Sequence, residues 1–187
     1  MFLKNRILIV ITIACWAVVS ITTAYAEGLS WFEAEDGRVL LSLEAGGEWV
    51  LEVPAGVRGV FFDGVQHRVN GKGFLSVIQV ADSSPENPEG VCGAGTEVWL
   101  QVYKANGELS SRILVSSCLE SISLSSQNTG LEGQDNNYSS IEWGKDGISI
   151  KWFSKKDGGG RSLSSTDYKV CGDFFCASDV LERSEVE

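Results

Sequence analysis

The feature that most constrains this chain is an alternation of apolar and polar residues with a period of two. It begins near Glu27 and is broken at short intervals by glycine-containing turns. Such alternation is typical of strands that bury one face, and no stretch long enough for a helix carries a helical stripe. We therefore predict an all-β fold, an antiparallel sandwich or barrel built from short strands and hairpins.

Turn signals divide the alternation into hairpins, because glycine and asparagine favour the backbone angles that tight turns require. In the clearest case, Ile141 and Trp143 share a face with Ile148, Ile150 and Trp152 across a short turn, and the opposite face is polar. We expect residues 155–165 to form a flexible Gly and Ser stretch, and residues 168–176 to form the last strand. The expected turns lie at 45–47, 63–64, 70–71, 106–107 and 144–147.

Residues 1–26 have the pattern of a cleavable secretion signal. Lys4 and Arg6 precede an apolar run over 7–21, and Ala24-Tyr25-Ala26 supplies the small residues of a cleavage site. The apolar run falls short of the ~20 residues that span a bilayer. We therefore expect export to the periplasm, no membrane attachment after cleavage, and a single all-β domain over residues 27–187. Its end, 178–187, is expected to be an acidic tail with slight helical character.

The charge of the chain restricts its partners. The full sequence has 15 basic and 25 acidic residues and a net charge of -10. Loss of Lys4 and Arg6 with the signal leaves 13 basic residues against the same 25, a net charge of -12. An acidic chain repels nucleic acid and anionic lipid, so we expect neither as a partner. A basic protein is the natural electrostatic partner, although such a charge also serves solubility alone.

Four of the five cysteines lie outside the signal, and an even number in an exported protein indicates disulfides. Of the three possible pairings, we favour the one that single hairpins or turns would bring about, which joins Cys92 to Cys118 and Cys171 to Cys176. In the chain-entropy model the longer loop contributes ~3 to 4 kcal/mol and the shorter ~2 kcal/mol. Zinc is a poor alternative because no histidine lies near Cys171 and Cys176.

The sequence offers little catalytic machinery. His67 is the single histidine, and no nucleophile motif accompanies it, so we expect a partly buried or edge-strand residue without catalytic duty. The many carboxylates, among them Glu33, Glu35 and Asp36, are explained by a solvated sheet face as well as by a glycosidase pair. Oxygen-rich turns such as 135–137 lack the ligand order of a calcium loop. We predict no enzyme, no metal and no cofactor.

The five tryptophans outside the signal allow two interpretations. Each of them fits an inward-facing strand position, and buried tryptophan is common in a domain of this size. Tryptophans that are exposed together on one face would instead indicate sugar stacking. An exported carbohydrate-binding or envelope-interaction module is therefore the alternative function. The residues concerned are Trp31, Trp49, Trp99, Trp143 and Trp152.

The loop 104–111 is the best candidate for partner binding. It is longer than a minimal turn, and Glu108, Leu109, Ser110 and Ser111 follow its Asn-Gly pair. We expect the two serine hydroxyls to project from a hairpin that the bridge from Cys92 braces. Such a loop is suited to plugging a cleft.

An exported, acidic, all-β domain with this Ser-Ser hairpin resembles the periplasmic immunity proteins that block peptidoglycan amidases delivered by type VI secretion. The resemblance covers about thirty residues between Cys92 and Cys118. It implies a toxin inhibitor whose loop, here Ser110 and Ser111, occludes the Cys-His active site of the amidase. We therefore predict that this protein binds a basic cell-wall hydrolase and inhibits it.

Overall fold

The computed structural model describes residues 28–183, so the predicted secretion signal and the last four residues lie outside the described part. Within it the chain forms thirteen strands and two short 3-10 helices, and every strand pairing is antiparallel. The all-β prediction is confirmed. No helix in this range has the length and apolar character needed to cross a membrane.

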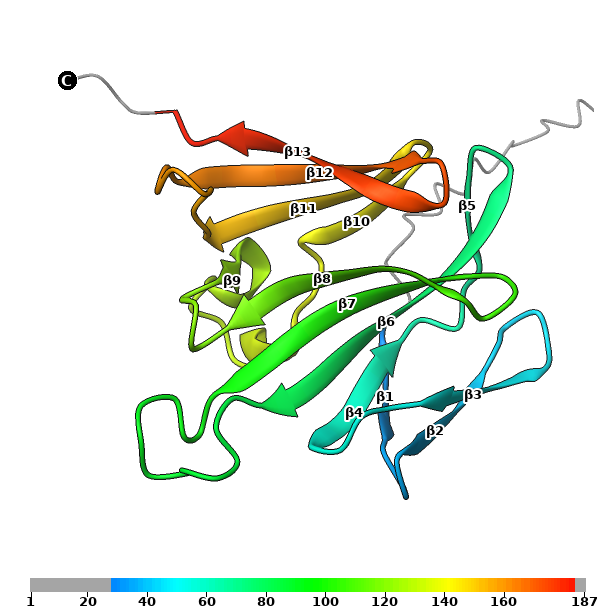
Figure 1. Cartoon of the computed structure of the whole chain (residues 1–187), viewed down its shortest axis with the longest axis horizontal. Helices are drawn as coiled ribbons and strands as arrows, with labels where there is room; N and C mark the ends of the chain where they lie inside the picture. Colours follow the sequence, from blue (N-terminus) through cyan, green and yellow to red (C-terminus); the bar gives the residue numbers. More distant parts are fainter. Residues whose placement is uncertain (1–27, 184–187) are drawn as a thin grey trace, which may run out of the picture.

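The strands form two large sheets and one separate hairpin (Figure 1). The first sheet has the order β1-β4-β6-β7-β8, with β5 also paired to β6, and the second has the order β10-β11-β12-β13, with β9 paired to β11. The bounds in the first sheet are β1 (Ser30–Glu33), β4 (Val57–Phe62), β5 (His67–Val69), β6 (Lys72–Asp82), β7 (Thr96–Lys104) and β8 (Leu109–Ser117). In the second sheet they are β9 (Ser123–Leu124), β10 (Ile141–Gly144), β11 (Gly147–Ser154), β12 (Leu163–Cys171) and β13 (Phe174–Leu181). The hairpin comprises β2 (Arg38–Ser42) and β3 (Glu48–Glu52), and the 3-10 helices are η1 (Ser125–Gln127) and η2 (Gln134–Asn136).

The first sheet is the middle of three layers. One of its faces packs against the second sheet, where Leu100 and Val115 meet Ile150 in the main core. On its other face, Val60 packs with Val39 of hairpin β2–β3 in a smaller core. Each such fully buried side chain contributes about 1.5 to 3 kcal/mol. Strand β6 is consequently buried on both faces over most of its length.

Both predicted disulfides are present. Cys92 and Cys118 have Cα atoms 5.7 Å apart, and those of Cys171 and Cys176 are 5.9 Å apart. The expected register is nearly right, because Glu97 pairs with Ser117 next to Cys118. Gly95 is required beside the first bridge, since a Cβ there would lie 2.7 Å from the Cys118 Cβ.

The C-terminal part differs from its prediction. The stretch expected to be flexible joins a strand at Leu163, and the expected last strand is a pair, β12 and β13, joined by a turn at Gly172 and Asp173. Gly172 has a φ of +71°, which glycine adopts readily. Strand β13 extends to Leu181, so the expectation of helical character is wrong for the described part of the tail. Pairing with β12 over eight register positions outweighs the weak helical preference of that segment.

Candidate partner-binding site

Hairpin β7–β8 carries the predicted site, and its turn is set by local sequence. Gly107 has a φ of +84°, and its N–H donates to the Lys104 carbonyl over 2.9 Å. The Asn106 side chain accepts from the Glu108 N–H at 3.1 Å, as asparagine often does in turns. The Lys104 N–H donates to the Glu108 carbonyl at 2.8 Å. The turn is therefore closed by three hydrogen bonds of its own.

Two of the predicted site residues are exposed at this turn. The Glu108 side chain is 61% exposed, and its carboxylate lies 3.2 Å from the Lys104 ammonium group. Leu109, the first residue of β8, is 47% exposed. The tip thus presents a carboxylate beside an apolar side chain.

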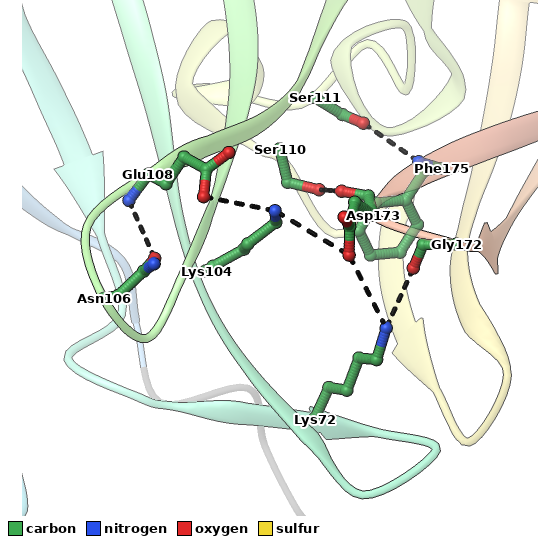
Figure 2. A network of polar contacts seen from close by, with 9 residues as sticks. All are labelled: Lys72, Lys104, Asn106, Glu108, Ser110, Ser111, Gly172, Asp173 and Phe175. Carbon is green, nitrogen blue, oxygen red and sulfur yellow. Dashed lines mark hydrogen bonds and ion pairs between the residues drawn. The ribbon is translucent and has the colours of Figure 1, made fainter.

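The two serines are placed differently from the prediction. Both belong to strand β8, and their hydroxyls bond to the turn between β12 and β13 (Figure 2). The Ser110 hydroxyl donates to the Asp173 carbonyl at 2.8 Å, and the Ser111 hydroxyl accepts from the Phe175 N–H at 3.1 Å. The expectation that these hydroxyls project freely is wrong. The register of β7 and β8 leaves Ser110 as an extra residue in a β-bulge, so both hydroxyls can reach the neighbouring sheet although successive residues of a regular strand point to opposite faces.

Two lysines complete this contact between the sheets, as Figure 2 shows. The Lys72 ammonium donates to the Gly172 carbonyl at 2.9 Å and lies 3.9 Å from the Asp173 carboxylate. Lys104 reaches the same carboxylate at 3.9 Å while it also pairs with Glu108. These exposed pairs are each worth at most about 1 kcal/mol, but together they fix where the turns lie. We call Lys72, Lys104, Ser110, Ser111 and Asp173 the polar latch.

Sequence reasoning found the serines of the polar latch but missed Lys72 and Asp173. Ser110 and Asp173 are 63 residues apart in the chain. A local pattern cannot indicate such a contact. The one available signal is the Cys171–Cys176 bridge, which predicts a tight and rigid turn around Asp173 without naming what it touches.

His67 lies at the junction of the two large sheets. Its Nε2 is 2.8 Å from the Asp63 carboxylate, and its ring stacks on Trp143 with centroids 4.3 Å apart. The Trp143 N–H donates to the Ser76 hydroxyl at 3.2 Å. His67 is partly buried in the edge strand β5, as predicted. Asp63, His67 and Trp143 therefore pack together where the two sheets meet.

The tryptophans are not all buried. Trp152 is buried and donates to the Thr166 hydroxyl at 2.9 Å, but Trp31 is 43% exposed, so the prediction of a buried core position is wrong for Trp31. Its ring lies against Phe61 and above Gly59, which has no side chain to displace it. Trp99 is partly exposed, and the Arg112 guanidinium lies 4.0 Å above its ring. The strand register places Trp31 and Trp99 on opposite faces of the first sheet.

Perturbed titrating groups do not gather around the polar latch. Burial raises the pKa of Tyr103, Tyr138 and Tyr168 from 10.0 to about 12. Desolvation lowers the pKa of Lys155, whose ammonium lies 4.0 Å above the Trp152 ring. Within residues 28–183 no group of three metal-binding side chains is close enough to hold an ion.

Comparison of this chain with protein families, with curated proteins and with solved structures finds no match.

Proposed function

We propose that this protein is exported to the periplasm, where it binds a basic cell-wall hydrolase and inhibits it without catalysis of its own. The observation that carries the proposal is the exposed tip of hairpin β7–β8, held in place by the polar latch. A binding loop that is already ordered loses less conformational entropy when it enters a cleft, so more of the contact energy appears as affinity.

In this proposal the four predicted residues have different tasks. Glu108 and Leu109 contact the hydrolase, because both are exposed at the tip. Ser110 and Ser111 position the tip, because their hydroxyls bond to the β12–β13 turn. The negative charge of the chain increases the rate of encounter with a basic partner.

The alternative, a carbohydrate-binding module, has less support. Sugar stacking on a sheet requires two exposed tryptophans on one face, and the register separates Trp31 from Trp99. Arg112 also covers the Trp99 ring. Binding of glycan chains remains the result that would favour this alternative in the experiment below.

The test is surface plasmon resonance, with an inhibition assay, against a secreted peptidoglycan amidase encoded beside the gene. The tip variant is Glu108→Lys with Leu109→Ser. Its matched control is Asp146→Lys with Leu119→Ser, which removes the same charge and the same type of side chain from other exposed sites. We expect the tip variant to bind at least tenfold more weakly, mainly through faster dissociation, and the control to change only the salt-dependent association rate.

Equal losses in both variants would show that charge alone drives the contact and would overturn the role of the tip. An amidase that the parent protein neither binds nor inhibits, together with binding to purified glycan chains, would replace the proposal with its alternative.

A further inference from the structure

The outward face of hairpin β2–β3 carries an apolar pair that the fold leaves uncovered. The hairpin buries Val39, Leu41 and Leu51 against the first sheet. On its opposite side, Leu40 is 53% exposed and Val50 is 57% exposed. These two residues are direct cross-strand partners, so their side chains stand next to each other on one surface.

A groove of about 460 Å³ runs along this pair. Leu40 and Val50 form its apolar part together with Phe32 and Val39, and the end of β1 with the turn that follows forms the other wall. That wall contributes Glu33, Glu35 and Asp36. Arg38 is the only basic side chain among the described residues that line it.

The carboxylates around the groove have no cationic partner within 4.0 Å in the described part of the chain. This is true of the three acids on the wall, and also of Glu48 and Glu52, which flank Val50 on the same face of β3. Five carboxylates and one basic residue, Arg38, which is the cross-strand partner of Glu52, surround the apolar pair, so the surface is acidic on balance. Such a surface is complementary to a basic segment with apolar side chains.

We propose that this groove binds an extended segment of a protein partner in which basic and apolar side chains alternate. The period of two places the apolar side chains of such a strand on Leu40 and Val50. Its lysines or arginines leave the strand on the other side, and their long, flexible side chains can bend over its edges to the surrounding carboxylates. The site is separate from the tip of β7–β8, and its occupant is defined by chemistry whether or not the partner is a hydrolase. Trp49 lies edge-on to Tyr103 with ring centroids 4.9 Å apart, so hairpin β2–β3 packs beside the turn of hairpin β7–β8, and one large partner can contact both.

The experiment uses the mature protein, isotopically labelled, and the synthetic peptide Lys-Val-Lys-Leu-Lys-Val-Lys, followed by NMR. The peptide Lys-Ser-Lys-Ser-Lys-Ser-Lys has the same charge and serves as the ligand control. We expect the apolar peptide to shift the amide signals of Leu40 and Val50 and to bind at least tenfold more tightly than the serine peptide.

Two pairs of matched variants test the two parts of the site. Leu40→Ser with Val50→Ser should weaken binding of the apolar peptide about tenfold. Leu119→Ser with Val180→Ser removes exposed apolar residues elsewhere and should leave that binding unchanged. Glu33→Gln with Glu35→Gln should weaken the binding of both peptides. Glu86→Gln with Glu89→Gln, which has the same net charge but alters an exposed loop, should weaken them less.

Unchanged binding of the apolar peptide by the Leu40 and Val50 variant would overturn the proposal. Equal affinity for the two peptides, or equal losses from the two glutamate pairs, would do the same, because the attraction would then be that of an acidic chain in general. None of these outcomes depends on inhibition of a hydrolase. The inference about the groove can therefore fail while the proposed function stands, and the proposed function can fail while the groove binds the peptide.

Discussion

Hairpins β7–β8 and β10–β11 share one local rule, a short glycine-containing turn between alternating strands, but distant parts of the chain hold them in different ways. In β10–β11, Trp143 stacks on His67, lies edge-on to Phe175 and donates to Ser76. In β7–β8 the equivalent attachment is the polar latch, through Ser110 and Ser111. Local sequence therefore determines that a hairpin forms, and long-range chemistry determines how firmly it is attached.

The aromatic attachment should be the stronger one. Replacing Trp143 by Ala removes the stacked ring and leaves a cavity between the sheets, which should lower the free energy of unfolding by about 3 to 5 kcal/mol. Urea denaturation measures this loss. Trp99→Ala is the control, because that ring is partly buried like Trp143 but has only the Arg112 guanidinium over it, whereas Trp143 contacts three aromatic rings, so its loss should cost clearly less. A Trp143 variant that lost no more stability than the Trp99 variant would contradict the comparison.

The polar attachment should contribute less to stability and more to the position of the tip. Ser110→Ala with Ser111→Ala removes two hydrogen bonds and should cost about 1 to 3 kcal/mol. Amide exchange at Gly107 and Glu108 should become faster, because β8 is released from the β12–β13 turn. Hydrogen exchange measured by NMR tests this.

Ser164→Ala is the matched control for the serine pair. Its hydroxyl also donates to a backbone carbonyl, that of Val180, but within hairpin β12–β13. Exchange at the β7–β8 tip should stay unchanged in this variant. If the tip amides exchange equally fast in the parent and in the Ser110 and Ser111 variant, the polar latch does not order the tip.

Much of the fold follows from local signals. The Asn106-Gly107 turn fixed the register of β7 and β8 closely enough to pair Cys92 with Cys118. The alternation around the turn at 144–147 placed Trp143, Ile148 and Trp152 together on the inner face. These predictions succeeded because two-residue periodicity and turn chemistry act over a few residues.

The failures concern contacts between distant segments. The alternation of apolar and polar residues predicts that Ser110 and Ser111 lie near the start of a strand. It does not predict which sheet their side chains contact. Trp31 fits an inward position by parity, yet it lies at the sheet edge, where the second sheet leaves its ring partly exposed. The exposure of the apolar pair Leu40 and Val50 could not be predicted either, because only the packing of hairpin β2–β3 decides which of its two faces is buried.

The smallest expected effect appears only at alkaline pH, and it compares the packing beside the turns of the two hairpins. Burial raises the pKa of Tyr103 at the end of β7 to about 12, and it does the same for Tyr168, which pairs with Ile148 beside the β10–β11 turn. A folded-state pKa above the ordinary value of 10.0 means that the unfolded chain releases its proton first. The stabilising contribution of each hydroxyl is therefore complete below about pH 10 and is lost as the pH rises toward about 12.

We expect the free energy of unfolding of the parent protein to fall over that range, and Tyr103→Phe and Tyr168→Phe each to make the fall less steep. Urea denaturation at about pH 9 and about pH 12, with tyrosinate absorbance as a direct titration, measures both quantities. If the free energy of unfolding falls as steeply in one of the two variants as in the parent protein, the tyrosine replaced there is exposed to solvent. The region beside that hairpin's turn is then packed more loosely than the region beside the other turn.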